Sequence, residues 1–148
     1  MHFARKATVA EGGEKAITYR LEFPSSDKIK YNFIGIYDGD MRERLDTSKL
    51  NWKWLFLPGN KALEELYREY LHVPENLEKF CEIVGKEKKQ IITMLATIDG
   101  NDYHDWFEEL RKFLGIDGKM LVRNFYRIMQ EMDKEIEEFI AELKKSIA

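Results

Sequence analysis

Two carboxylates, Asp38 and Asp40, flank a glycine directly after the most apolar stretch of the chain, Phe33-Ile34-Gly35-Ile36. In an extended backbone, residues two apart point to the same side, so both carboxylates can face one ligand. Gly39 between them allows a close turn. Mg²⁺ favours oxygen ligands and commonly takes one or two protein carboxylates, leaving its other positions to water and phosphate. The turn Tyr37-Asp38-Gly39-Asp40 therefore predicts a site for Mg²⁺ or Mn²⁺.

The same turn has a purely structural interpretation. Asp38 and Asp40 can form an Asx turn and cap a short helix near Met41 to Leu45. The sequence leaves both interpretations open.

Two apolar segments are expected to position this turn. Tyr31 to Tyr37 is nearly continuous in apolar residues, which is typical of a central strand buried on both faces. Trp52 to Leu57 predicts a second strand, and Pro58-Gly59 ends it. Because sites in α/β sheets lie beyond the carboxyl ends of strands, the acidic turn falls where a site is expected.

The N-terminal part predicts an antiparallel hairpin. Phe3 to Val9 and Lys15 to Phe23 are rich in β-branched and aromatic residues, and they flank Glu11-Gly12-Gly13-Glu14. Two glycines supply the positive φ of a tight turn. The fold class expected is α/β: a small mixed sheet with an N-terminal hairpin and a helical C-terminal half.

From Asn60 onward, apolar residues recur at three- and four-residue spacing, which indicates helices. Asn60 is a plausible N-cap, Pro74 suits the first turn of a second helix, and Asn101 or Asp102 can cap a later one. Glycines 85 and 115 are expected to end helices. A final helix of about thirty residues is predicted from near Asp117, long enough to project past the core. Its apolar stripe comprises Leu121, Phe125, Ile128, Met132, Ile136, Phe139, Leu143 and Ile147.

Length and composition favour one globular domain over residues 1–148, with a sheet-rich part (1–59) and a helical part (60–148). The 24 basic and 27 acidic side chains give a net charge of −3, which argues against wrapping nucleic acid by bulk charge. Cys81 is the single cysteine, so an internal disulfide and a cysteine-built zinc site are excluded. With no signal peptide and no membrane-spanning apolar run, we expect a cytoplasmic protein with no membrane partner.

Other polar and aromatic residues give weaker signals. His2, His72 and His104 form no zinc-enzyme pattern; His104 could be a proton shuttle or a surface residue near a helix start. Trp52 and Trp54 could stack on nucleic-acid bases, although alternation in a strand puts both on one face and favours core packing. Basic residues of the segment 86–89, with Arg111 and Lys112, could face phosphate or form solvated helix faces.

The segment Phe33-Ile34-Gly35-Ile36-Tyr37-Asp38-Gly39-Asp40 resembles the strand and acidic Asp-x-Asp turn of a TOPRIM module. The next elements, a strand ending Leu57-Pro58-Gly59 and an acidic helix Leu63-Glu64-Glu65-Leu66, are similar to the TOPRIM segment of overcoming-lysogenization-defect (OLD) type ATPases. The stretch from His104 to Leu110 resembles the helical end of such chains. The resemblance covers about Tyr31 to the C-terminus.

This resemblance implies a divalent-metal site for phosphodiester cleavage, or a degenerate scaffold for a partner nuclease. Asp38 and Asp40 would hold Mg²⁺ or Mn²⁺. Glu11 is the best match to the family's glutamate beside the metal, which acts as acid or base, and Glu14 is the second candidate. The family has a helix after this glutamate, whereas the pattern of residues 16–23 indicates a strand. On the hairpin interpretation, both glutamates are solvated turn residues.

The chain has no Gly-x-x-x-x-Gly-Lys-Ser/Thr loop, so it is not itself the ATPase. It is expected to be a piece of a longer protein, a subunit that docks on an OLD-type ATPase in phage defence, or a stand-alone relative. Its partners would be that ATPase, a second copy of the chain, or DNA. The alternative is a non-catalytic adaptor that assembles through its long C-terminal helix.

Overall fold

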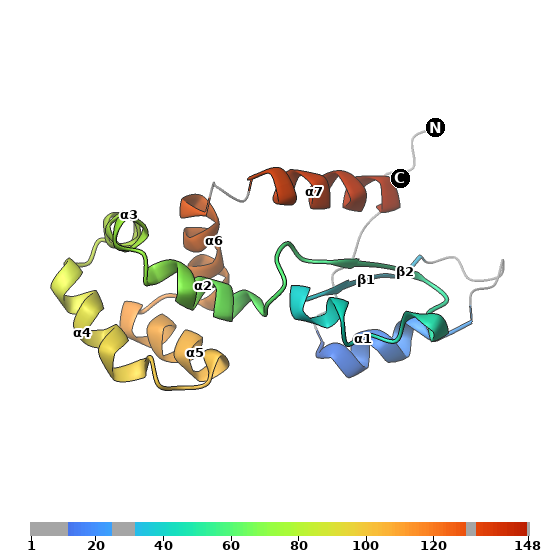
Figure 1. The fold of residues 1–148 in the computed structure, drawn as a ribbon, viewed down its shortest axis with the longest axis horizontal. Coiled ribbons are helices and arrows are strands. Elements are labelled where there is room, and N and C mark those ends of the chain that lie inside the picture. Colours follow the sequence, from blue (N-terminus) through green and yellow to red (C-terminus); the bar gives the residue numbers. More distant parts are fainter. Residues whose placement is uncertain (1–11, 25–31, 130–132, 148) are drawn as a thin grey trace.

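The structure is a computed structural model that describes residues 12–24, 32–129 and 133–147. Seven α-helices and a two-stranded parallel sheet lie within these residues, so the fold is mixed α/β but dominated by helices. The sheet and α1 form one side of the molecule, and α2 to α6 form the other (Figure 1).

The sheet consists of β1 (Ile34–Tyr37) and β2 (Lys53–Phe56), with Ile34 opposite Lys53 and Tyr37 opposite Phe56. In the chain, the 3₁₀ helices η1 (Gly39–Arg42) and η2 (Thr47–Lys49) connect β1 to β2. Beyond the strands, the Leu57 N–H donates to the Tyr37 carbonyl at 2.8 Å. Because the strands are parallel, the turns that follow them meet at one edge of the sheet.

The predicted hairpin is wrong over the residues described, because Glu14–Leu21 is a helix, α1, with Gly13 at its N-cap position. The expected strand at 3–9 lies outside the described residues. Leu21 is 2% exposed and packs with Ile17, one helical turn away, in the cluster beneath the sheet. Gly35 makes this contact possible, since a Cβ there would lie 2.4 Å from Leu21 Cδ1. Burial of one helix face against β1 therefore outweighs the strand propensity of this segment.

The expectation that β1 is buried on both faces is also wrong. Gly35 and Tyr37 are buried, but Ile36 between them is 38% exposed. The apolar run instead reflects one face covered by α1 and a second face that is only partly covered. Since the described sheet has two strands, a central position for β1 stays a prediction.

Five helices enclose the main hydrophobic core (Figure 1). Trp106, Phe80 and Phe125 are fully buried there, and Tyr67 stacks on Phe125 with ring centroids 4.2 Å apart. The shared core explains why the apolar positions of this half recur with helical spacing. The helices are α2 (Leu63–Leu71), α3 (Pro74–Val84), α4 (Lys88–Ile98), α5 (Tyr103–Leu114) and α6 (Gly118–Ile128).

Most of the predicted helix ends are confirmed. Pro74 opens α3, and Gly85 and Gly115 end α3 and α5 with φ of 65° and 67°. The Asp102 and Asp117 side chains accept N-cap hydrogen bonds from backbone N–H groups of α5 and α6, at 3.0 and 2.7 Å. Asn60 is not the N-cap of α2; Ala62 occupies that position. The loop before α2 bends at residues 58–61, where Gly59 packs against the turn after β1.

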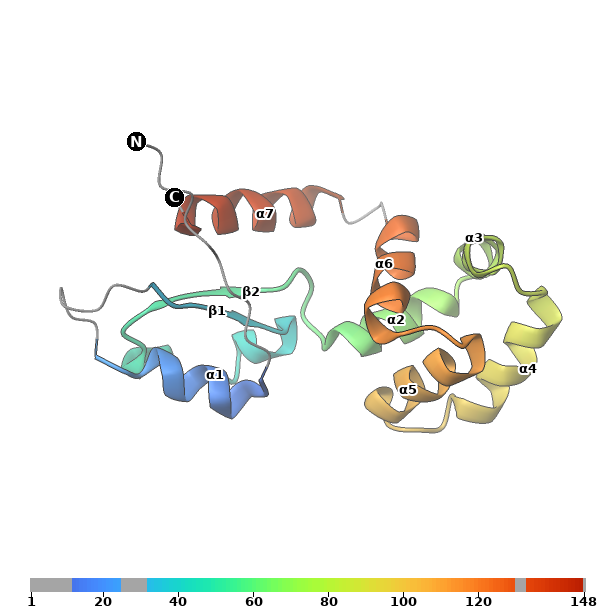
Figure 2. The ribbon, with the colours of Figure 1, turned by 180° about the vertical axis from the view of Figure 1, so that it is seen from behind.

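The prediction of one long final helix is wrong. It divides into α6 and α7 (Asp133–Ile147), and Met129 leaves the helical conformation with ψ of 34°. The described part of the apolar stripe is divided between two partners, and on α7 it is only partly buried, with Ile147 exposed. Leu121 and Phe125 of α6 enter the helical core, whereas α7 turns back along β2 (Figures 1 and 2).

Polar contacts hold α7 to the sheet. Lys53 Nζ pairs with Glu142 Oε1 at 2.5 Å, and the Gly59 N–H donates to Glu135 Oε2 at 3.2 Å. Phe139 and Trp54 line an open cavity of about 770 Å³ between α7 and β2. Among the described helices, none is long and apolar enough to cross a membrane.

Candidate functional site

The Asp38 carboxylate is not engaged in capping. Asp38 follows β1 directly and occupies the N-cap position of η1, yet its side chain makes no cap hydrogen bond. Asp40 pairs with Arg44 at 3.1 Å, within the same turn. The Asx-cap interpretation is therefore wrong for Asp38.

The turn between the two aspartates is fastened to the turn after β2. A Cβ on Gly39 would lie 2.4 Å from the carbonyl oxygen of Gly59, so no larger residue fits without moving backbone. Arg42 donates from Nε to that same carbonyl at 3.2 Å and from Nη2 to the Leu57 carbonyl at 3.0 Å. These contacts give the aspartates a fixed backbone.

The first turn of α2 follows this junction closely. Gly59 has φ of 87°, and a Cβ there would lie 2.9 Å from Leu66 Cδ1. Glu64, two residues before Leu66, is only partly exposed. Contact between the Gly39 and Gly59 turns therefore brings a third carboxylate, from the helical half, close to the acidic turn.

His104 reaches the same region from α5. Its backbone N–H is held by Asp102 Oδ1 at 3.0 Å, and its ring lies 4.3 Å from the Tyr103 ring. Its Nδ1 lies 3.7 Å from Glu64 Oε1, across the contact between α5 and α2. His104 is exposed, as expected of a surface histidine, but it also faces a carboxylate next to the acidic turn.

The pKa values indicate that these groups share one electrostatic environment. Burial raises the pKa of Asp38, the Glu64 and Asp40 carboxylates raise it further, and His104 partly opposes them. The pKa of the Tyr103 hydroxyl is also raised, first by burial and then by Asp40 and neighbouring carboxylates. Like charges therefore accumulate around Asp38, an arrangement that a bound cation would relieve.

The structure places the other expected site residues less favourably or not at all. Glu11 lies outside the described residues, so its place beside the metal stays a prediction. Glu14 is an exposed residue in the first turn of α1. In the described parts of the chain, no group of three or more His, Cys, Asp or Glu side chains is arranged to hold a metal ion. The extended backbone expected between the two aspartates is absent, because Asp40 lies in the 3₁₀ helix η1. A Mg²⁺ or Mn²⁺ site at Asp38 and Asp40 therefore stays a prediction.

The tryptophans serve the core of the sheet. Trp52 Nε1 donates to the Phe23 carbonyl at 2.7 Å, and its ring meets Phe33 edge-on at 5.2 Å. Trp52 and Trp54 are both half-buried and pack on the cluster of Leu21, Tyr37 and Met41. Core packing is the better account of this pair.

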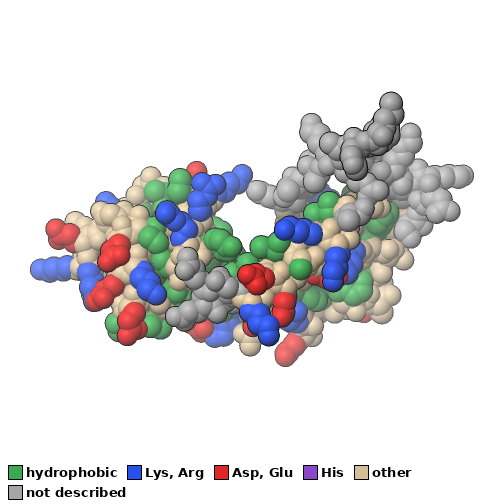
Figure 3. Space-filling model, turned by 90° about the horizontal axis from the view of Figure 1, so that it is seen from above, with side chains coloured by type: hydrophobic (Ala, Val, Ile, Leu, Met, Phe, Trp, Pro, Cys, Tyr) green, Lys and Arg blue, Asp and Glu red, His purple; other side chains and the backbone are tan. Residues whose placement is uncertain are grey.

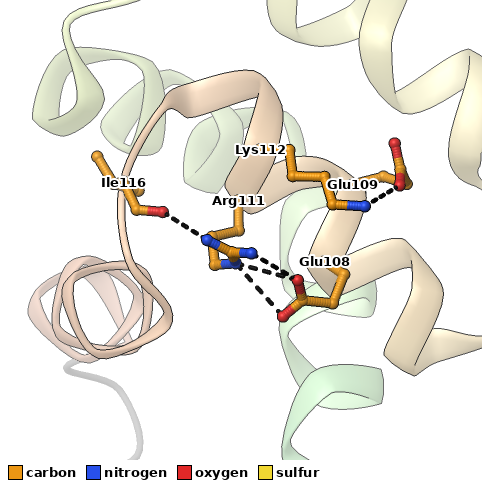
Figure 4. A network of polar contacts seen from close by, with 5 residues as sticks. All are labelled: Glu108, Glu109, Arg111, Lys112 and Ile116. Carbon is orange, nitrogen blue, oxygen red and sulfur yellow. Dashed lines mark hydrogen bonds and ion pairs between the residues drawn. The ribbon is translucent and has the colours of Figure 1, made fainter.

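Three of the basic residues noted at the helix ends, Lys88, Arg111 and Lys112, are paired with acids. Arg111 and Lys112 bind Glu108 and Glu109 of the same helix (Figure 4). Lys88 pairs with Glu78 at 2.6 Å. Side chains of both charges are interspersed on the face seen in Figure 3. Helix-surface ion pairs are therefore the better account of these three residues.

Sequence reasoning did not single out Glu64 as a site residue, and it left His104 undecided. The signal for Glu64 was its place in an acidic first turn soon after Pro58-Gly59. Comparison of the chain with protein-family models, with curated proteins and with solved structures gives no match. The site is therefore interpreted from its own geometry.

Proposed function

We propose that this chain is a TOPRIM-like module that binds Mg²⁺ or Mn²⁺ through Asp38 and Asp40. The observation that carries the proposal is the Asp38 carboxylate, which follows the parallel strand β1, makes no capping hydrogen bond and lies among other carboxylates. A divalent cation there would neutralise the charge that raises the pKa of Asp38.

The order of elements supports the same proposal. A helix follows Glu11-Gly12-Gly13, as the resemblance to TOPRIM modules implies, and the two strands that follow are parallel. The hairpin interpretation was the main reason to treat Glu11 as a solvated turn residue, and α1 removes that reason. Glu11 is accordingly our candidate for the third carboxylate and for the acid or base.

In this function Asp38 and Asp40 would hold the metal, which when bound would supply Lewis-acid chemistry for a phosphodiester and an attacking water. Arg42 and Gly39 hold the backbone of the turn so that both carboxylates keep their positions. With no phosphate-binding loop of its own, the module would act beside an OLD-type ATPase in phage defence, as a nuclease on DNA or as a degenerate scaffold.

The direct test is the melting temperature in a titration with Mg²⁺ and Mn²⁺. A ligand that binds only the native state raises it, so wild type should respond and an Asp38→Asn, Asp40→Asn variant should not. The matched control is Glu75→Gln, Glu82→Gln, which removes two exposed charges from α3, remote from the turn. A rise in the aspartate variant equal to that of wild type would contradict the proposed site.

The second candidate is a non-catalytic adaptor that assembles through the C-terminal helix. Ile140 and Ile147 of α7 are 37% and 44% exposed, which leaves apolar surface for a partner or a second copy. However, Phe139 of the same helix lies against the sheet of its own chain. We therefore favour the metal-binding function. Substitution of Asp38 and Asp40 should change the response to metal if this function is right, whereas substitutions in α7 should change assembly if the adaptor function is right.

A further inference from the structure

The outward face of α6 carries basic and uncharged side chains only. Leu121 and Phe125 are fully buried in the helical core, so the opposite side of the helix faces outward. In Figure 2, α6 lies nearer the viewer than α2, on the outside of the helical half. Between Asp117 and Glu131 the sequence has no acid. The exposed residues of this α6 face are Lys119, Met120, Val122, Arg123, Tyr126 and Arg127.

The three positive charges of the α6 face are not paired. Among the residues that the structure describes, no ion pair joins Lys119, Arg123 or Arg127 to an acid. The basic residues of α5 differ, because Arg111 and Lys112 each bind a glutamate three residues earlier in the same helix. Since α6 has no acid to do this, its outward face has a local excess of positive charge, although the net charge of the chain is −3.

The three charges form a nearly straight row along the helix. Residues four apart lie on the same side of a helix, and four residues rise by about 6 Å, so the row extends over about 12 Å. Tyr126 borders the row three residues after Arg123, and its side chain is 53% exposed. Val122, one turn before Tyr126, and Met120 are exposed as well. The α6 face therefore combines a line of positive charge with an open aromatic ring.

A strand of nucleic acid matches this face better than an acidic protein surface does. Protein surfaces intersperse charges of both signs, as this chain does elsewhere (Figure 3), so an acidic protein would also bring positive charges against the row. A nucleic-acid strand carries one negative charge per nucleotide without interruption. The guanidinium groups of Arg123 and Arg127 can each donate two hydrogen bonds to one phosphate. An unpaired base can in addition stack on Tyr126, which bases enclosed in a duplex cannot do.

We propose that the α6 face binds single-stranded nucleic acid. Its three basic residues bind phosphates of the backbone, and Tyr126 stacks on a base. The contact uses no metal, so it is independent of the function proposed for Asp38 and Asp40. It gives the helical half a binding role of its own.

The first experiment measures binding of a fluorescent oligothymidine in EDTA at several salt concentrations. Each phosphate contact on a single strand contributes about −0.7 to the slope of log K against log salt concentration, so three contacts give about −2. The affinity of wild type should therefore fall roughly twentyfold between about 50 and 200 mM salt. Most of this salt dependence should be lost in the variant Lys119→Gln, Arg123→Gln, Arg127→Gln. Glutamine is a good helix former, so circular dichroism should show an unchanged melting temperature.

The matched control removes the same charge from another part of the surface. Its substitutions are Lys15→Gln and Arg20→Gln in α1 and Lys144→Gln in α7, at exposed residues that also form no ion pair within the described ranges. The slope of this control should stay close to that of wild type. If the control and the α6 variant lose the same part of the slope, the effect is one of net charge and the proposal is overturned.

The second experiment tests the stacking on Tyr126. Tyr126→Ala should weaken binding about tenfold, since the loss of one stacked base is of this size. Its slope against salt should match that of wild type, because the tyrosine ring carries no charge. Tyr126→Phe keeps the ring and should bind as wild type does. An equal affinity of Tyr126→Ala and wild type would refute the stacking, and with it the choice of a single strand.

Two competitors test the identity of the occupant. Unlabelled oligothymidine should displace the probe, whereas duplex DNA and polyglutamate of equal charge should displace it less well. If polyglutamate competes as well as oligothymidine, an acidic protein is the occupant and the proposal is wrong. If wild type does not bind oligothymidine even at low salt, the proposal is refuted, and the metal titration of Asp38 and Asp40 is unaffected.

Discussion

The packing of α1 on β1 can be tested through one contact, between Gly35 and Leu21. In Gly35→Ala, the new Cβ would lie 2.4 Å from Leu21 Cδ1, more than 1 Å inside the usual carbon–carbon contact of about 3.5 to 4.0 Å. Leu21 is 2% exposed and has no route to solvent. The substitution should therefore lower the free energy of unfolding by about 1–3 kcal/mol, as overpacking of a core does.

A second substitution, at Leu21, tests whether the loss of stability comes from this contact. Leu21→Ala alone should cost about 2–5 kcal/mol, because it leaves a cavity under the sheet. In the double variant, the methyl group introduced by Gly35→Ala occupies part of that cavity and no longer clashes. The double variant should therefore be more stable than the sum of the single changes implies, by about 1 kcal/mol or more.

The assay is urea denaturation followed by circular dichroism, with the four proteins of the cycle compared at constant m-value. Gly100→Ala is the control, since a Cβ there meets nothing within 4 Å, and it reports the effect of the extra methyl group on the unfolded chain. If the losses in the free energy of unfolding of the two single variants simply add in the double variant, Gly35 and Leu21 are not in contact. The packing of α1 under β1 would then be refuted.

Three further predictions concern charge, the last helix and a cap. The pKa of Asp38 is raised in the fold, so the stability that this group contributes is present below its ordinary pKa of 3.8 and is lost as the pH rises through the raised value. In a metal-chelating buffer, Asp38→Asn should thus melt higher than wild type at pH 7, and the difference should vanish toward acid pH; a lower melting temperature at pH 7 would contradict this. Ile136→Asp with Phe139→Asp should release α7 from β2, because each change removes about 1 kcal/mol of stabilisation from a half-buried apolar side chain. Faster hydrogen exchange over 133–147 at an unchanged elution volume is expected, whereas loss of an oligomer would favour the adaptor. Asp117→Ala removes the cap hydrogen bond to the Met120 N–H and should cost about 1 kcal/mol by urea denaturation; an unchanged stability would mean that the cap is replaced by water.

The features that sequence predicted well are those decided by local chemistry. Pro74, Gly85 and Gly115 mark helix ends because their backbone preferences allow few other places. Asp102 caps α5, one of the two residues predicted to do so, because a carboxylate near free N–H groups is stabilising in any context. The last helical segment was also predicted to begin near Asp117, where α6 begins. The acidic turn after β1 was found because a strand end and two carboxylates two residues apart are both visible in the sequence.

The failures concern elements whose state is decided by distant partners. Residues 14–21 contain Ile17, Thr18 and Tyr19, which favour strands, and the helix forms because Ile17 and Leu21 can pack under β1. Gly35 was the missed signal, because a glycine inside a strand often marks close approach of another element. The break between α6 and α7 could not be predicted from the sequence, because apolar residues recur at the same three- and four-residue spacing in both helices. The meeting of Glu64 with His104 depends on the packing of α2 against α5, which no local pattern contains.

The return of α7 to β2 has a consequence for how the protein emerges from the ribosome. Lys53 and Glu142, which join the two elements, are 89 residues apart in the chain. At about 5–20 residues per second, synthesis of the intervening segment takes on the order of ten seconds. During that interval α2 to α6 can form their mostly local contacts. The strand β2 is not yet covered, because α7 has not been synthesised. The nascent chain therefore exposes the side of this short strand that carries Lys53 and Leu55, and this is when premature association with other chains is easiest.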